Sequence, residues 1–223
     1  MTSLATLTDR TFDAVLFDMD GTLINSIPVV ERSWLQWAQE FGVDPYQLHG
    51  LHGIPAKGVI SRLLPQQRWD EAIARICELE ENDTEGIVVL PGALDALTGL
   101  PPGRAAIATS CTRELARVRI AATGLPVPTV VVTAEQTEVG KPAPDPYLLA
   151  ARLLGVDPTR CLVVEDATGG VQAGRAAGCA TLAVLTHLTP GSSGADAEVA
   201  DLAAVSFVVN AEGVRLRPAG GAR

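Results

Sequence analysis

The chain has 223 residues, with 26 acidic side chains against 17 lysines and arginines and a formal net charge of −9. This acidic balance gives no general attraction to nucleic acid or to an anionic membrane, so neither is expected as a partner. Hydrophobic residues make up 47% of the chain, which predicts a folded protein. The 4 cysteines form no CxxC pair, and no apolar run is long enough to span a membrane. We expect a cytoplasmic monomer with reduced thiols.

Short apolar runs alternate with helical patterns along most of the chain. The expected strands are at 12–20, 104–110, 128–135, 160–166 and 180–186, and the expected helices between them are at 91–100, 112–124, 145–156 and 170–178. Strands that are apolar throughout are typical of a parallel sheet covered on both faces. The alternation therefore predicts a doubly wound α/β fold, whose site forms at the carboxyl ends of the strands.

A helical stretch interrupts this alternation after the first strand. Residues 25–88 contain two amphipathic helical patterns, at 29–42 and 69–83, with no strand between them. We expect a small helical domain at 25–88, inserted into a core domain made of 1–24 and 89–223. The alternative is that these helices simply pack on the core.

Two carboxylates follow the first expected strand. Asp18 and Asp20 lie two residues apart, so in extended chain they share a face, and Gly21 permits a sharp turn directly after them. Carboxylate oxygens suit a hard cation such as Mg²⁺. An Asx-type turn would explain the same residues, so this pattern alone leaves both interpretations open.

Other polar groups follow later strands. Thr109 and Ser110 come after "AAIA", Lys141 lies between Gly140 and a proline, and Glu165 and Asp166 end "CLVV". Taken singly, these are a helix N-cap or an anion-binding turn, a surface lysine, and a helix cap or a metal ligand. Their order along the chain and their position at strand ends favour a single site.

These motifs carry a resemblance to a known family. Asp18-x-Asp20-Gly21-Thr22, Thr109-Ser110, Lys141-Pro142 and Glu165-Asp166 resemble, in order, the four motifs of the haloacid dehalogenase-like (HAD) phosphohydrolases. The likeness covers essentially the whole chain. The long gap after the first motif is similar to the helical C1 cap of that family.

The resemblance implies a mechanism. Asp18 would be the nucleophile that forms an aspartyl-phosphate. Asp20 would be the general acid for the leaving alcohol and then the base that activates water.

The resemblance also implies a cofactor and a phosphate site. Mg²⁺ would be held by Asp18, the backbone carbonyl of Asp20 and Asp166, with Glu165 in support. The phosphoryl oxygens would be held by Thr109, the Ser110 N–H and Lys141.

The substrate is expected to be a small sugar or polyol phosphate. The segment 48–58, "LHGLHGIPAKG", is expected to be a flexible loop of the cap that presents His49, His52 and Lys57. With "ATSCTRE" it resembles the sugar- and polyol-phosphate phosphatases, such as those for glycerol-3-phosphate and 2-deoxyglucose-6-phosphate. His52, Lys57 and Arg113 are therefore candidate substrate contacts, although a surface position explains Arg113 equally well.

Other activities of the same fold remain open. Asp20 argues against dehalogenases, which usually lack this second aspartate. A phosphosugar mutase keeps all four motifs, but mutases commonly carry a histidine and an arginine at positions that here hold Val30 and Ala56. Phosphoglycolate phosphatase is a further alternative. A catalytically silent binding protein would be expected to have lost motif residues.

Overall fold

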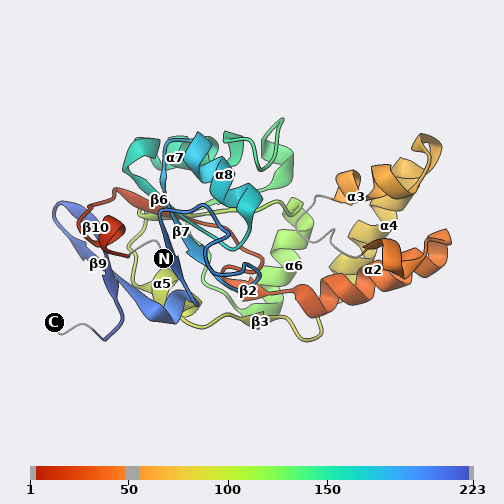
Figure 1. Ribbon diagram of the computed structural model, residues 1–223, viewed down its shortest axis with the longest axis horizontal. Coiled ribbons are helices and arrows are strands. Elements are labelled where there is room, and N and C mark those ends of the chain that lie inside the picture. Colours follow the sequence, from red (N-terminus) through yellow and green to blue (C-terminus); the bar gives the residue numbers. More distant parts are fainter. Residues whose placement is uncertain (1–3, 49–55, 221–223) are drawn as a thin grey trace.

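The computed structural model describes residues 4–48 and 56–220, and a six-stranded parallel sheet lies at its centre (Figure 1). The strands, in spatial order, are β5 (Val130–Val132), β4 (Ala105–Ala108), β1 (Ala14–Phe17), β6 (Cys161–Glu165), β7 (Ala180–Val184) and β8 (Ala197–Val199). All five neighbouring pairs are parallel. The predicted doubly wound fold and its five strands are confirmed, and β8 is an addition at the edge.

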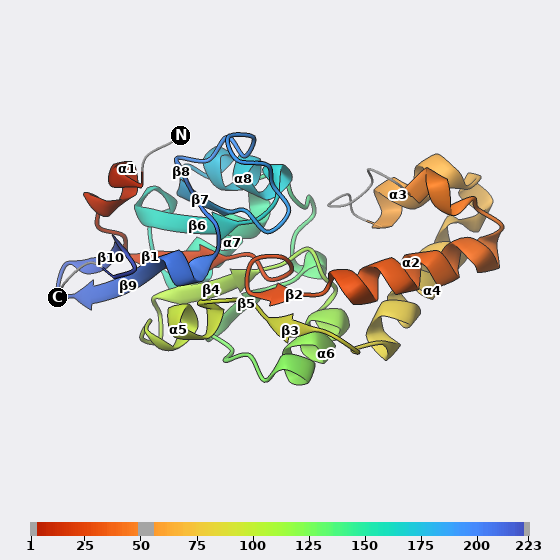
Figure 2. The ribbon, with the colours of Figure 1, turned by 60° about the horizontal axis from the view of Figure 1, so that its bottom comes forward.

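Helices cover both faces of the sheet. They are α5 (Ala93–Thr98) and α6 (Arg113–Thr123) on one face, and α7 (Asp145–Leu154) and α8 (Thr168–Ala176) on the other (Figure 2). In β1, Val15 and Phe17 pack with the side of α5 and α6, while Ala14 and Leu16 pack with the side of α7 and α8. Successive side chains of a strand point to opposite faces, so a strand buried on both sides is apolar at every position.

Three further helices form a separate unit. They are α2 (Ile27–Phe41), α3 (Ala56–Leu63) and α4 (Trp69–Asn82), to the right in Figure 1. Their own hydrophobic cluster centres on Trp37, which is fully buried. The Trp37 Nε1–H donates to the Ala72 carbonyl at 2.9 Å, and its ring stacks on Phe41 at 4.8 Å. In the described part of the chain, this cluster shares no residue with the clusters around the sheet.

The two chain connections to this helical unit pair with each other. β2 (Ile24–Asn25) leads into it and β3 (Val88–Val89) leads out, and the two form a short antiparallel ribbon. Ile24 lies opposite Val89 and Asn25 opposite Val88. The unit is therefore joined to the sheet by two adjacent segments at one place.

One sequence expectation for the helical unit is wrong. Residues 56–58 belong to α3 and not to a loop, because Val59 and Ile60 bury their side chains and extend the helical pattern back to Ala56. Lys57 is accordingly an exposed residue of this helix. His49 and His52 lie outside the described residues.

The chain ends contribute elements that the sequence pattern did not predict. β9 (Val205–Asn210) and β10 (Gly213–Pro218) form an antiparallel hairpin, and α1 (Ala5–Thr8) lies near the start of the chain. The hairpin packs on the core through Phe207, whose ring meets that of Phe17 edge-on at 5.8 Å. It adds a cover over the face of the sheet that carries α5 and α6.

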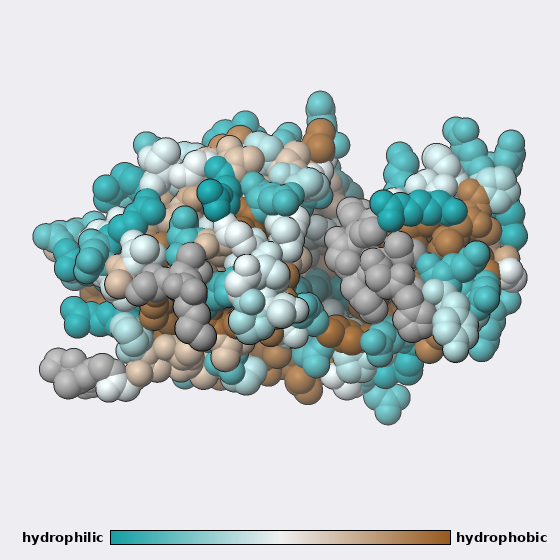
Figure 3. All heavy atoms as spheres, viewed as in Figure 1, coloured by the Kyte–Doolittle hydropathy of each residue, from teal (hydrophilic) through white to brown (hydrophobic). Residues whose placement is uncertain are grey.

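The surface agrees with the composition of the chain. Hydrophilic residues are spread over both units on the face shown in Figure 3, and hydrophobic residues appear there only in scattered patches. Among the described helices, none combines the length and the apolar character needed to cross a membrane.

Trp37→Ala is expected to lower the free energy of unfolding by about 3–5 kcal/mol, because it removes the centre of the helical unit's cluster. Leu35→Ala on the same helix is the control: Leu35 is 48% exposed, and its loss is expected to change stability by no more than about 0.5 kcal/mol. Urea denaturation followed by circular dichroism measures both. Equal effects would contradict the assigned packing.

Candidate active site

Three neighbouring strands bring polar residues to one edge of the sheet. Asp18 directly follows β1, Thr109 follows β4, and Glu165 and Asp166 lie at the end of β6. Parallel register aligns these ends, and the Asp18 N–H donates to the Val164 carbonyl at 2.9 Å. The convergence expected from the sequence is therefore present.

The carboxylates of this edge form a buried cluster. Asp18, Glu165 and Asp166 each offer an oxygen within 4.8 Å of the others, and their exposed fractions are 7%, 1% and 5%. Lys141 lies among them, with Nζ at 2.5 Å from Asp18 Oδ1 and at 2.7 Å from Glu165 Oε1. The lysine is thus a specific counter-charge and not a surface residue.

Burial and charge act on these groups together. Burial raises the pKa of Asp18 well above its usual range, while the charge of Lys141 opposes this rise. Burial alone would lower the pKa of Lys141, but the negative charges of Asp18 and Glu165 outweigh it and raise that pKa. Lys141 is therefore a fixed cation at neutral pH.

Glu165 has both carboxylate oxygens fully engaged. Oε1 accepts from Lys141 and from the Tyr147 hydroxyl at 2.8 Å, and Oε2 accepts from the backbone N–H groups of Asp166 at 3.0 Å and Ala167 at 3.2 Å. A carboxylate with four donors is positioned to hold its neighbours and is poorly placed to bind a cation directly. Sequence reasoning missed Tyr147, and the available signal was a phenol within the apolar stretch of a largely apolar helix, since a buried hydroxyl needs a partner.

Asp166 is in contact with a second residue that sequence reasoning missed. Its Oδ2 lies 2.5 Å from His187 Nδ1, and its Oδ1 accepts from the Thr22 hydroxyl at 3.4 Å. Burial raises the pKa of Asp166, and the hydrogen bond with His187 opposes the rise. His187 follows β7, so its position just beyond a strand end was the signal. Gly21 allows the close approach, because a Cβ there would overlap the Asp166 carboxylate and its φ is +86°.

The cluster fits a hard divalent cation. Three carboxyl groups and a single ammonium group meet at this edge, so the carboxyl groups outnumber their counter-charge. Because Glu165 is engaged by four donors, Asp18 and Asp166 are the carboxylates that could bind the ion directly. Oxygen ligands of this kind suit Mg²⁺.

Asp20 lies in a different environment. Its Oδ1 accepts from the Ser26 hydroxyl at 2.7 Å and from Arg119 Nη1 at 2.8 Å, and its Oδ2 accepts from the Cys111 thiol at 3.0 Å. Among the described residues, the carboxylate of Asp20 is not part of the cluster formed by Asp18, Glu165 and Asp166. The two aspartates of the first motif therefore have different surroundings.

The turn after β4 is not the helix cap that one interpretation assigned to it. Thr112 caps α6, because its hydroxyl oxygen accepts from the Leu115 N–H at 3.2 Å. Thr109 is buried, and its hydroxyl oxygen accepts from the Cys111 N–H at 3.0 Å. Ser110 is exposed beside it. Ser110 is therefore exposed in the turn after β4, at the same end of the sheet as the acidic cluster.

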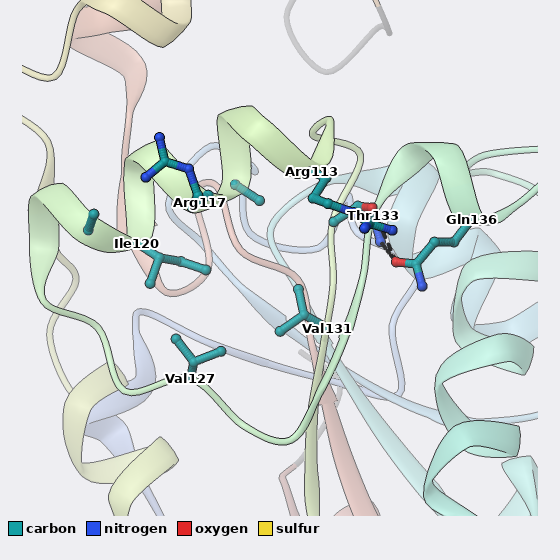
Figure 4. Close-up of a pocket in the computed structure, with 9 residues that line it drawn as sticks. Arg113, Arg117, Ile120, Val127, Val131, Thr133 and Gln136 are labelled. Carbon is teal, nitrogen blue, oxygen red and sulfur yellow. Dashed lines mark hydrogen bonds between the residues drawn. The ribbon is translucent and has the colours of Figure 1, made fainter.

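Arg113 lies on a separate pocket of about 440 Å³ between α6 and the end of β5. Figure 4 shows Arg113 at one end of this pocket, with Ile120, Val127 and Val131 along it. Its backbone N–H donates to the Glu135 carboxylate at 2.9 Å. Asp18 and Lys141 are not among the described residues that line this pocket. The structure does not bring Arg113 into the acidic cluster.

The residues of the candidate site lie in a part of the chain that matches a known family. The family model of the haloacid dehalogenase-like hydrolases matches residues 15–184, which include Asp18, Lys141, Glu165 and Asp166. This chain belongs to the haloacid dehalogenase-like hydrolase family. The resemblance seen in the motifs is therefore confirmed.

Relatives in this family share most of the chain. It is 45% identical over 175 residues to hexitol phosphatase A of Escherichia coli K12, covering 76% of this chain and 81% of that protein. It is 35% identical over 191 residues to glycerol-1-phosphate phosphohydrolase 1 of Saccharomyces cerevisiae, covering 78% and 75%. The crystal structure of a putative beta-phosphoglucomutase from Thermotoga maritima has a TM-score of 0.65 and 27% identity, covering 84% and 94%.

Gly170→Ala is expected to lower the free energy of unfolding by about 2 kcal/mol or more. A Cβ at Gly170 would overlap the Glu165 carboxylate, which its four hydrogen bonds prevent from moving away. Gly169→Ala is the control, because a Cβ there meets nothing within 4 Å; its stability is expected to stay equal or rise by up to about 1 kcal/mol. Urea denaturation compares the two, and similar losses would contradict this packing.

Proposed function

We propose that this protein is a Mg²⁺-dependent phosphatase that hydrolyses a small sugar or polyol phosphate monoester through an aspartyl-phosphate on Asp18. The observation that carries the proposal is the buried contact of Asp18 with Lys141, beside Asp166, at the carboxyl end of the central strand. The names of the two relatives, a hexitol phosphatase and a glycerol-1-phosphate phosphohydrolase, support the substrate class.

Asp18 would act as the nucleophile. Lys141 holds one carboxylate oxygen, which fixes the orientation of the group before an Asp18 oxygen attacks phosphorus. As the new O–P bond forms, the bond from phosphorus to the leaving oxygen breaks, and Asp20 donates a proton to that oxygen. Asp20 would then take a proton from water, which attacks the same phosphorus and releases phosphate from Asp18.

Other residues would stabilise charge. Asp18, Asp166 and the backbone carbonyl of Asp20 would hold Mg²⁺, with Glu165 fixing the position of its neighbours. When bound, the ion supplies positive charge that offsets the carboxylates and the phosphoryl oxygens. Lys141, Thr109 and the Ser110 N–H would bind the phosphoryl oxygens as charge develops on them.

The helical unit at 25–88 would be a cap domain over the remaining core. Its separate hydrophobic cluster and the pairing of β2 with β3 support this division. Lys57 on α3 is proposed as a substrate contact, as is His52, which lies outside the described residues. Arg113 is not proposed again, because it lies on the separate pocket beside α6. Action as a monomer in the cytoplasm stays a prediction from the sequence.

A phosphosugar mutase is the second candidate. It is favoured by the likeness to the putative beta-phosphoglucomutase structure, at 27% identity. The phosphatase relatives are more similar, at 45% and 35% identity, so hydrolysis is the preferred activity.

Phosphate release from sugar, polyol, glycolate and nucleotide monophosphates tests the proposal. Release is expected to be greatest for a polyol or hexose phosphate and to stop when Mg²⁺ is chelated. Asp18→Asn is expected to abolish turnover, and Asp20→Asn to reduce it by about 10²- to 10⁴-fold, the usual contribution of a general acid–base. Asp9→Asn, a change at an exposed aspartate, is the matched control and is expected to keep full activity.

Two outcomes would overturn the phosphatase assignment. Isomerisation of a phosphosugar without net phosphate release would establish the mutase. Turnover that survives in Asp18→Asn would remove Asp18 as the nucleophile.

Mg²⁺ is expected to raise the free energy of unfolding of the wild-type protein, and with it the melting temperature. The gain is about 2.7 kcal/mol when the Mg²⁺ concentration is a hundred times the dissociation constant. Because the pKa values of Asp18 and Asp166 are raised, protons compete with the ion, and the stabilisation should shrink as the pH falls below neutral. Differential scanning fluorimetry from neutral to acidic pH measures this. Asp166→Asn should lose the Mg²⁺ response, and a full response in this variant would contradict the ligand assignment.

A further inference from the structure

Arg119 is a buried arginine between the two units of the molecule. Its side chain is 3% exposed and belongs to α6, which lies beside α4 of the helical unit in Figures 1 and 2. Nη1 donates to Asp20 Oδ1 at 2.8 Å, and Nη2 donates to Glu80 Oε2 at 3.2 Å. Glu80 belongs to α4 and is 14% exposed. One guanidinium group therefore joins Asp20 to the inserted helices.

The hydrogen bonds of Asp20 distinguish its two oxygens. Oδ1 accepts from both Arg119 and Ser26, which are strong donors at 2.8 and 2.7 Å. Oδ2 accepts from the Cys111 thiol, which is a weak donor. Burial raises the pKa of Cys111 well above its usual range, so the thiol keeps its proton. The rotation of the Asp20 carboxylate is thus set by Oδ1, and Oδ2 is the oxygen more available for proton exchange.

Stability alone does not account for Arg119. Its Nε is buried and lacks a hydrogen-bond partner among the described residues. Its Nη1 contacts the Cys111 sulfur at 3.2 Å as well as Asp20, and its Nη2 contacts Glu80. Removing a charged pair from water is unfavourable, and an apolar pair of similar volume is often at least as stable. The arginine is better explained by what it orients than by what it stabilises.

We propose that Arg119 is a positioning residue that holds Asp20 in the orientation used for proton transfer, and that Glu80 makes this orientation depend on the placement of the helical unit. The inference rests on the proposed role of Asp20 as general acid–base. The planar guanidinium presents two nitrogen atoms in a fixed fork, one to each carboxylate, whereas a lysine ammonium is a single nitrogen on a flexible chain.

The leaving group provides a specific readout. A polyol phosphate leaves as an alkoxide and needs a proton from Asp20, whereas p-nitrophenyl phosphate leaves as a stable phenolate and needs none. Asp20 also serves the later hydrolysis of the aspartyl-phosphate, which is the same for both substrates, so the readout is kcat/KM, which reports only the steps through release of the leaving group. Loss of a residue that positions Asp20 should lower kcat/KM selectively for the polyol phosphate. A general loosening of the structure should slow both.

The test compares kcat/KM for both substrates in five proteins: the wild type, Arg119→Lys, the double variant Arg119→Met/Glu80→Met, Glu80→Gln and Arg117→Met. The double variant removes both charges of the bridge between the units, so neither Arg119 nor Glu80 is left as a lone buried charge. Arg117 is an exposed arginine on the same helix, paired with Glu114, and its replacement is the matched control. The polyol phosphate is glycerol phosphate or the panel's best alkyl monoester.

In the double variant, kcat/KM for the polyol phosphate is expected to fall about 10- to 100-fold, a part of the full general-acid contribution, with less than about a 3-fold change in kcat/KM for p-nitrophenyl phosphate. Arg119→Lys should lie between this variant and the wild type. Arg117→Met should leave the ratio of the two rates unchanged. Glu80→Gln, which keeps the bond from Arg119 to Asp20, should give a smaller selective loss.

Equal losses of kcat/KM on both substrates, or no loss of kcat/KM on either, would overturn the positioning role. Should the double variant fail to fold by circular dichroism, Arg119→Lys decides by the same ratio. An unchanged ratio in Glu80→Gln would remove the helical unit from the proposal. If the wild type releases phosphate from neither substrate, the proposed function itself fails. If the wild type hydrolyses both substrates and the variants keep its ratio of the two rates, only the positioning role fails.

Discussion

The contact of the Lys141 ammonium with Asp18 and Glu165 is the interaction on which the rest of the site depends. Three carboxylates lie at one buried edge of the sheet, where their mutual repulsion would be unfavourable without a cation. Lys141 reaches them from the segment between β5 and α7 and remains charged there. In the proposed mechanism the same cation would also bind the phosphoryl oxygens. Fold stability and catalysis would then use one charge arrangement.

Glu165 transmits this arrangement to the elements around it. Its four donors come from the segment before α7, from α7 itself and from the backbone that enters α8. The absence of a side chain at Gly170 lets α8 begin against the carboxylate. One glutamate thus locks two helices to the sheet and fixes the backbone that carries Asp166. Glu165 has no direct part in the proposed reaction. It nevertheless positions Lys141 and Asp166, which do.

The two aspartates of the first motif differ in their connection to the helical unit. Asp18 is bound by Lys141 of the sheet unit, whereas Asp20 is bound by Arg119, which also reaches Glu80 on the helical unit. The nucleophile would thus keep its position whatever the helices do, and the acid–base would respond to them. This division suits a reaction in which attack needs a rigid carboxylate and proton transfer needs a closed site.

Local patterns in the sequence determined five of the six strands of the sheet, the helices between them and the residues at the strand ends, because alternation of apolar runs and the end of each run are read from neighbouring positions. They identified Asp18, Lys141 and Asp166 as members of one site. Only the tertiary structure decided that Glu165 is the carboxylate engaged by four hydrogen-bond donors, that Tyr147 and His187 complete the cluster, and that Arg119 binds Asp20. These contacts join residues up to 99 positions apart, and no local periodicity records a pairing that depends on how strands and helices stack in space.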